Sequence, residues 1–160
     1  CFTSDHGEGL GAHRWVQKAS LYEESVHVPF VLAGPGVQRG VSGRLVSLLD
    51  ILPTLCDYAG IDGPREMRGL SLRKDQPRPY VVSELRYRDA ERDGRMVRSE
   101  RYKYIVFRTG AQAEQLFDLE KDPGEVVNLA GEPGAKPELE RHRAMLSEWS
   151  RTTGDGFARV

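Results

Sequence analysis

The sequence predicts an α/β fold, arranged as an α+β fragment: the end of a mostly parallel sheet with helices, then a small antiparallel sheet packed by a carboxy-terminal helix. Three observations support this prediction. Residues 1–62 alternate short apolar runs with loops and a helical pattern, residues 63–79 are rich in Gly, Pro and charge, and residues 80–160 contain β-branched and aromatic runs followed by an amphipathic stretch. We therefore predict an α/β core portion, a connecting segment and an antiparallel subdomain over these three ranges.

The composition is that of an ordinary globular protein. Of the 160 residues, 39% are hydrophobic and 29% are charged, and the formal net charge is −1, so the charge balance does not favour nucleic acid as a partner. No run approaches the ~20 apolar residues of a membrane-spanning helix, so no membrane span is predicted. Cys1 and Cys56 stand far apart in apolar runs, which predicts two buried structural thiols. Nothing in the sequence indicates the cellular compartment.

Cys1, Phe2 and Thr3 are predicted to end a buried strand, and two helices and a second strand are predicted in the rest of residues 1–62. Helical spacing and the absence of Gly and Pro predict a short helix over residues 18–26. The apolar run at residues 29–33 predicts a buried strand of a largely parallel sheet. Asp50 is a good N-cap for a helix over residues 51–59, whose apolar positions share one face that should pack on the sheet.

The second part predicts an antiparallel meander covered by one helix. Strands are expected near residues 80–84, 96–99, 102–107 and 115–119, because β-branched and aromatic residues gather there and turn residues separate the runs. After Pro137, apolar residues repeat at helical spacing through residue 149 and predict an amphipathic helix on one face of the meander. The tail after Arg151 is expected to be loosely ordered.

The first stretch places a carboxylate and an imidazole side by side. Asp5 and His6 follow a short apolar strand, and ligands of α/β sheets gather at the carboxyl ends of strands. Neighbours in a strand point to opposite faces, so both side chains can serve one ion only if the chain bends here, which Gly7 permits. The alternative is a loop carboxylate that caps a turn beside a hydrogen-bonded histidine.

Several motifs follow one another along nearly the whole chain. They are Phe2-Thr3-Ser4-Asp5-His6-Gly7-Glu8, Leu10-Gly11 with His13, Lys18, Tyr22-Glu23-Glu24, Val28-Pro29, Leu49-Asp50-Ile51-Leu52-Pro53-Thr54-Leu55, Ala59-Gly60-Ile61, Arg101-Tyr102-Lys103-Tyr104, Leu116-Phe117-Asp118-Leu119, Asp122-Pro123 and Asn128-Leu129. In this order they resemble the second half of a sulfatase of the alkaline phosphatase superfamily. The resemblance implies that the first part of the chain ends an alkaline-phosphatase-like sheet.

The resemblance also implies a metal site and a sulfate site. In sulfatases the positions of Asp5 and His6 bind a divalent cation, with Asn or His at the second position. Ca²⁺ is the ion the family favours, Mg²⁺ is an alternative, and Mn²⁺ tolerates imidazole better than Ca²⁺ does. Lys18 is implied to contact the substrate sulfate and to neutralise charge during catalysis. His13 can be a general acid for the leaving alcohol, a sulfate contact or a polar loop residue.

One departure from the family concerns the nucleophile. Sulfatases form a formylglycine from a Cys-x-Pro-x-Arg or Ser-x-Pro-x-Arg motif, which this sequence does not contain. The resemblance therefore implies a carboxy-terminal portion whose partner is the amino-terminal part of the same enzyme, and whose substrate is a small-molecule or carbohydrate sulfate ester. Alone, the chain is expected to be inactive. The alternatives are a phosphodiesterase or phosphonate monoester hydrolase of the same superfamily, and a non-catalytic structural or interaction module.

Overall fold

The computed structural model describes residues 1–87 and 90–157. The helices are α1 (Glu23–Val26), α2 (Ile51–Ala59) and α3 (Lys136–Thr153), and the strands are β1 (Phe2–Thr3), β2 (Phe30–Val31), β3 (Val81–Leu85), β4 (Gly94–Arg98), β5 (Tyr102–Phe107) and β6 (Glu114–Asp118). Short 3₁₀ turns lie at Ala12–Arg14, Leu48–Asp50, Ala90–Arg92 and Pro133–Ala135. None of the helices in the described ranges has the length and apolar character needed to cross a membrane.

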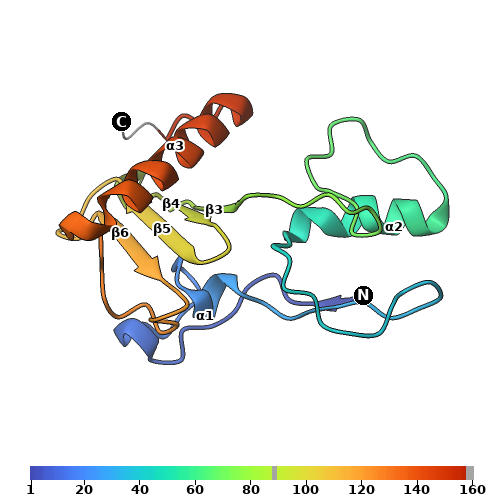
Figure 1. Cartoon of the computed structure of the whole chain (residues 1–160), viewed down its shortest axis with the longest axis horizontal. Coiled ribbons are helices and arrows are strands. Elements are labelled where there is room, and N and C mark those ends of the chain that lie inside the picture. Colours follow the sequence, from blue (N-terminus) through green and yellow to red (C-terminus); the bar gives the residue numbers. More distant parts are fainter. Residues whose placement is uncertain (88–89, 158–160) are drawn as a thin grey trace.

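Strands β3 to β6 form one antiparallel sheet in which each strand pairs with the next in the sequence. Met96 of β4 lies opposite Ile105 of β5, and Tyr104 of β5 lies opposite Leu116 of β6. Figure 1 shows this sheet at one end of the molecule, covered by α3, while α2 and its loops lie apart from it. The predicted antiparallel sheet with its terminal helix is confirmed.

The sheet buries side chains on both faces, because neighbouring residues of a strand point to opposite sides. Tyr104 and Val106 pack in a cluster with Leu139 and Leu146 of α3. Ile105, between them, packs in a second cluster with Leu21 from the first part of the chain. Each fully buried leucine contributes about 1.5–3 kcal/mol to stability. The segment around α1 is therefore attached to the sheet on the face opposite α3, as Figure 1 shows.

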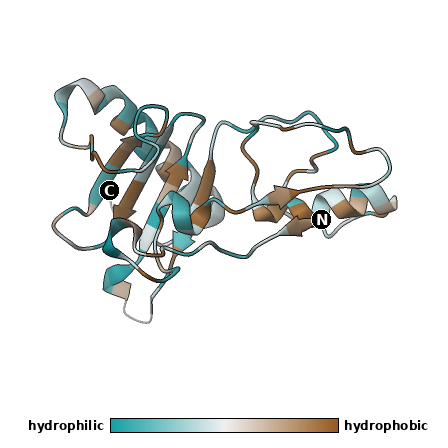
Figure 2. Cartoon of the chain, turned by 90° about the horizontal axis from the view of Figure 1, so that it is seen from below, coloured by the Kyte–Doolittle hydropathy of each residue, from teal (hydrophilic) through white to brown (hydrophobic). Residues whose placement is uncertain are grey.

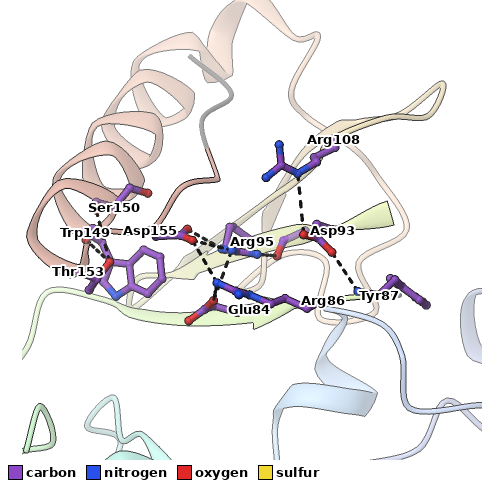
Figure 3. A network of polar contacts seen from close by, with 11 residues as sticks. Glu84, Arg86, Tyr87, Asp93, Arg95, Arg108, Trp149, Ser150, Thr153 and Asp155 are labelled. Atoms are coloured by element: carbon purple, nitrogen blue, oxygen red, sulfur yellow. Dashed lines mark hydrogen bonds and ion pairs between the residues drawn. The ribbon is translucent and has the colours of Figure 1, made fainter. Parts of the chain in front are cut away.

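The tail after α3 is ordered, so the prediction of a loose tail is wrong for residues 152–157. The helix continues to Thr153 and ends at Gly154, whose φ of 71° is left-handed. Asp155 then forms two hydrogen bonds to the buried guanidinium of Arg95, and Phe157, 4% exposed, joins the core beside it. Figure 3 shows this network on strand β4. Residues 158–160 lie outside the described range.

The first part of the chain differs from the prediction in three respects. Only Glu23–Val26 is helical, because Leu21 is inserted in the core of the sheet and the Tyr22 hydroxyl donates a hydrogen bond to Gln115. Strand β2 is two residues long, pairs antiparallel with β1 and leaves Val31 exposed, so the buried parallel strand predicted at residues 29–33 is wrong. Cys56 is buried as predicted, but Cys1 is exposed.

Helix α2 has the predicted bounds and ends at Gly60, whose φ of 67° is left-handed. Asp50 does not cap it. This carboxylate is fully buried and accepts hydrogen bonds from the backbone N–H groups of Ser47 and Leu70, which ties the segment at residues 62–79 to the start of the helix. The Ser47 side chain forms the capping box of the preceding 3₁₀ turn.

The apolar face of α2 is exposed, so the predicted packing of that face on the sheet is wrong for this chain. Leu52 and Leu55 are 50% and 46% exposed. The buried side of the helix instead faces the segment at residues 62–79, where the backbone N–H of Leu72 donates to the Thr54 hydroxyl. Figure 2 shows hydrophobic ribbon in α2 and in the nearby β1 and β2.

His142 of α3 is a buried structural histidine, as expected for a core position. Its Nδ1 lies 2.7 Å from the Glu138 carbonyl oxygen, to which it donates, so Nε2 is left to accept from the Ser99 hydroxyl at 2.9 Å. Burial is the main cause that lowers the pKa of His142, although the carbonyl contact opposes it. The folded protein therefore holds the neutral imidazole.

Acid is expected to destabilise the protein through His142. Because its pKa is lower in the folded than in the unfolded state, the unfolded state binds more protons as pH falls below about 6.5, and the free energy of unfolding decreases by at most about 1.4 kcal/mol per pH unit. Urea unfolding between pH 7.5 and 5 measures this loss. His142→Gln should flatten that part of the pH profile, and a profile as steep as that of the wild type would show that His142 does not cause the loss.

Candidate functional site

Asp5 and His6 lie together in the loop that follows β1. The Oδ2 atom of Asp5 is 3.5 Å from Nε2 of His6. His6 Nδ1 lies 2.7 Å from the Gly7 carbonyl oxygen, and the Ser4 hydroxyl donates to the carbonyl of His6 at 2.7 Å. The chain bends at Asp5, and the two side chains lie close enough together to bind one ion.

This arrangement suits a divalent cation. A carbonyl oxygen can only accept, so Nδ1 carries the proton and the lone pair of Nε2 faces the Asp5 carboxylate. Histidines that bind metals usually donate their other N–H to a carbonyl or carboxylate in this way. Metal–ligand distances of about 2.0–2.6 Å are compatible with two donor atoms 3.5 Å apart on one ion.

The Asp5 carboxyl group is also kept ionised. Desolvation tends to raise the pKa of Asp5, but hydrogen bonds from the backbone N–H groups of Asp5 and His6 and the charge of Lys18 act in the other direction, and the pKa is lowered. Lys18 itself is exposed, so its ammonium remains available to a ligand that also contacts the loop. The carboxylate oxygen of Asp5 is the kind of ligand that hard cations prefer.

Gly7 fixes this loop against α1. Its backbone N–H donates to the Ser25 carbonyl at 2.9 Å. A Cβ atom at Gly7 would lie 1.9 Å from the Glu24 carbonyl oxygen, so only glycine allows the two backbones to approach this closely. The position of Asp5 and His6 therefore depends on the position of α1.

The following loop is strained. Leu10, His13 and Arg14 have φ angles of 47°, 49° and 60°, in the left-handed region that residues other than glycine rarely adopt. Among the described residues, one further non-glycine residue, Glu125 with a φ of 51°, shares this conformation. Such strain costs about 1–3 kcal/mol per residue and tends to gather at functional sites.

His13 is held by α1. Its ring stacks on Tyr22 with centroids 3.8 Å apart and an interplanar angle of 9°, and its Nε2 lies 3.4 Å from a carboxylate oxygen of Glu24. Glu125 adds a third potential ligand atom, and within the described ranges this trio has atoms that all lie within 4.8 Å of one another. A cavity of about 440 Å³ opens beside these side chains.

The sequence indicated Asp5, His6, Lys18 and His13, and the structure brings the first two into contact. Lys18 acts electrostatically on Asp5, while His13 is in contact with Tyr22 and Glu24. Glu125, which lies beside Glu24 and His13, was not indicated. The signal that could have found it is its place two residues after the Asp122-Pro123 motif.

Known proteins match this chain over most of its length. Residues 11–151 match the family described as N-sulphoglucosamine sulphohydrolase, C-terminal. A Delta 4,5-hexuronate-2-O-sulfatase from Bacteroides thetaiotaomicron is 42% identical over 96% of this chain, and human arylsulfatase K is 38% identical over 81% of it. The chain covers 35% and 27% of the lengths of these two relatives.

The fold is similar to that of solved sulfatase structures. A structure of a 2-O GAG sulfatase superposes with a TM-score of 0.89 at 41% sequence identity, over 99% of this chain and 37% of that chain. The α/β architecture of this chain is thus that of the corresponding part of solved sulfatases. The chain belongs to the sulfatase family and corresponds to the C-terminal region of its members.

Proposed function

We propose that this chain supplies part of the active site of a sulfatase that hydrolyses sulfate monoesters, with Asp5 and His6 as ligands of a divalent cation and Lys18 as a sulfate contact. One observation carries the proposal. His6 donates through Nδ1 to the Gly7 carbonyl and directs its other nitrogen toward Asp5, as a metal-binding histidine does. Membership of the sulfatase family supports the interpretation of this geometry as part of a metal site.

The proposed cation supplies Lewis-acid stabilisation of charge on the sulfate oxygens. Asp5 and His6 hold the ion on one side, and the remaining ligands come from outside these two positions. Ca²⁺ is the first candidate, because carboxylate oxygen suits it, and Mg²⁺ and Mn²⁺ are the alternatives. The formylglycine nucleophile that the family uses would come from the amino-terminal part.

Lys18 and His13 are proposed as the catalytic side chains of this piece. Lys18 is exposed and its charge already acts on Asp5, so its ammonium can bind an anion held beside the cation. His13 is oriented by stacking on Tyr22 and by the carboxylate of Glu24, which are the contacts of a positioned acid–base group. We propose His13 as the donor of a proton to the leaving alcohol.

The substrate class follows from the relatives. One relative, 42% identical over nearly the whole chain, is named as a hexuronate 2-O-sulfatase, and a similar structure is described as a 2-O GAG sulfatase. We therefore propose a sulfated carbohydrate, with a 2-O-sulfated unsaturated hexuronate as the first compound to examine. An aryl sulfate and a phosphonate monoester test the wider superfamily.

The amino-terminal part of the enzyme is the proposed partner of the exposed apolar face. Leu49, Leu52 and Leu55 are 63%, 50% and 46% exposed, and Phe2 of β1 is 67% exposed. Apolar patches of this kind mark interaction sites. The two relatives are about three times as long as the part that this chain matches or longer, so the preceding region of such a protein is available to cover this surface.

Asp5→Ala in the full-length protein that carries this chain is expected to abolish hydrolysis of the 2-O-sulfated hexuronate and to raise the dissociation constant for Mn²⁺ at least 100-fold. The reason is that the site loses the one carboxylate this loop offers. Calorimetric titration with Mn²⁺ and a sulfate-release assay measure the two effects.

Asp75→Ala is the matched control, because Asp75 is an exposed aspartate that pairs with Arg44, away from the Asp5–His6 loop. It should leave both quantities unchanged. Unaltered Mn²⁺ binding in Asp5→Ala would refute the metal assignment. A preference for the phosphonate monoester over every sulfate ester offered would instead place the protein with the phosphonate hydrolases of the superfamily.

A further inference from the structure

We infer that Lys103 is a positioning residue: it attaches the segment at residues 21–26 to the sheet through Glu23 and Glu125, and that segment holds the Asp5–His6 loop in place. The Arg101-Tyr102-Lys103-Tyr104 motif has no part in the proposed chemistry. The positioning role accounts for the lysine in this motif. The inference rests on the proposed function only for what the loop binds.

Lys103 is a fully buried ammonium on β5. Its Nζ atom lies 2.7 Å from a carboxylate oxygen of Glu23 and 2.8 Å from Oε1 of Glu125, and it donates to the Leu21 carbonyl at 3.2 Å. The contact with Glu125 is an ion pair without the geometry of a hydrogen bond. An isolated buried charge would be very costly, so the ammonium requires these three acceptors and holds them at one point.

Glu125 completes the attachment from the other side. It is 3% exposed, and its second oxygen, Oε2, accepts a hydrogen bond from the backbone N–H of Glu23 at 2.6 Å. That N–H is at the start of α1, where a carboxylate is favourable because the first N–H groups of a helix lack partners. The left-handed φ of Glu125 shows that the loop after β6 bends to place this carboxylate.

The attached segment is in direct contact with the metal loop. The Ser25 carbonyl accepts the hydrogen bond of Gly7, the Glu24 carbonyl packs where a Cβ of Gly7 would be, and the Glu24 side chain reaches His13. A movement of α1 therefore moves Asp5, His6 and His13 together. Four residues of helix have little stability of their own, so external contacts must fix α1.

Leu21 alone does not explain this geometry. It is 1% exposed and anchors the segment in the core, but apolar packing is not directional and leaves rotation about this contact open. The ion pairs of Lys103 with Glu23 and Glu125 restrain the segment from two further directions, which limits this rotation. They also argue against a second metal site at His13, Glu24 and Glu125, because the Lys103 ammonium lies 2.8 Å from Glu125 and would repel a cation bound there.

Lys103→Met in the full-length protein tests the inference. It removes the ammonium that the buried Glu125 shares with the partly exposed Glu23, so the segment should detach from the sheet while the sheet persists. We expect amide hydrogen exchange in residues 5–9 to accelerate at least tenfold, exchange in β5 to stay within a factor of two of wild type, and the Mn²⁺ dissociation constant to rise at least tenfold. Glu125→Gln keeps the size of the side chain and removes its charge, so it should change the exchange of residues 5–9 and the Mn²⁺ dissociation constant in the same direction but by less. If Lys103→Met does not fold, Glu125→Gln replaces it as the test.

Val97→Ala is the matched control, because Val97 is buried on the α3 face of the sheet and has no contact with the attached segment. It should accelerate exchange of the sheet without a selective effect on residues 5–9. Exchange of residues 5–9 at the wild-type rate in a folded variant, or acceleration of these residues and β5 by the same factor, would overturn the inference. So would unaltered Mn²⁺ binding when Asp5→Ala abolishes it. If Asp5→Ala leaves Mn²⁺ binding intact, the assignment of Asp5 as a metal ligand fails. The amide exchange of residues 5–9 still tests whether Lys103 positions this loop.

Discussion

Asp155→Ala is expected to lower the free energy of unfolding by about 3–5 kcal/mol, the cost of leaving a buried charge without its partner. Both Asp155 oxygens accept hydrogen bonds of 2.8 Å from Arg95, and the two side chains are 4% and 2% exposed. Nη1 of Arg95 also donates to the Gly94 carbonyl, and a Glu84 oxygen lies 3.4 Å from Nη2, beside the Asp155 contacts drawn in Figure 3. Urea unfolding of the wild type and the variant measures the loss.

The matched control is Glu148→Ala, which removes an exposed carboxylate of α3 that pairs with Arg151 within one helical turn. Exposed pairs of this kind contribute little, so its unfolding midpoint should equal that of the wild type. The double variant Arg95→Met/Asp155→Ala should be more stable than Asp155→Ala alone, because the uncompensated guanidinium is gone. Equal midpoints for Asp155→Ala and the control would show that the tail adds nothing to the fold.

This tail also shows what the sequence could not reveal. Asp155 and Phe157 stand among glycines and polar residues, where local pattern predicts disorder. Their partner Arg95 is on β4, some sixty positions earlier, and an arginine in the middle of a strand carries no signal that it will be buried. Only the packing of α3 across the sheet brings the tail to it.

The antiparallel sheet was predictable for the opposite reason. In residues 102–107 every residue except Lys103 is a Val, Ile, Tyr or Phe that favours a strand, and the neighbouring runs provide its partners within a few residues. Helix α2 was equally evident from its own spacing, but its apolar face does not pack on the sheet, and Leu52 is half exposed. Local pattern therefore fixes the element, whereas its environment depends on distant residues.

The candidate site divides in the same way. Asp5 and His6 were visible because their residue types and the adjacent glycine suggest a ligand pair, and the structure brings them within 3.5 Å. Glu125 is more than a hundred positions from Glu24 and has no local signal of proximity. Lys103 offered a weak signal, since it alternates with Tyr102 and Tyr104 and shares a strand face with Ile105, so a buried lysine with partners could have been expected.

Lys18→Met in the full-length protein is expected to lower kcat/KM for the sulfate ester about 100- to 1000-fold, the usual loss when a charge-stabilising group is removed from an active site. Lys18 is exposed and lies outside the helices and strands, so the variant should unfold at the wild-type urea midpoint. Its positive charge acts on Asp5, so Mn²⁺ binding should stay the same or become slightly tighter without it.

Lys18→Arg should recover part of the rate, because a positive charge returns with a different shape. Lys121→Met, which removes another exposed lysine, should behave as the wild type in both assays. A sulfate contact thus predicts a large loss of activity with intact metal binding, and the two measurements separate it from the metal ligands, whose loss affects both. A change of less than threefold in kcat/KM for Lys18→Met would show that Lys18 does not contact the sulfate.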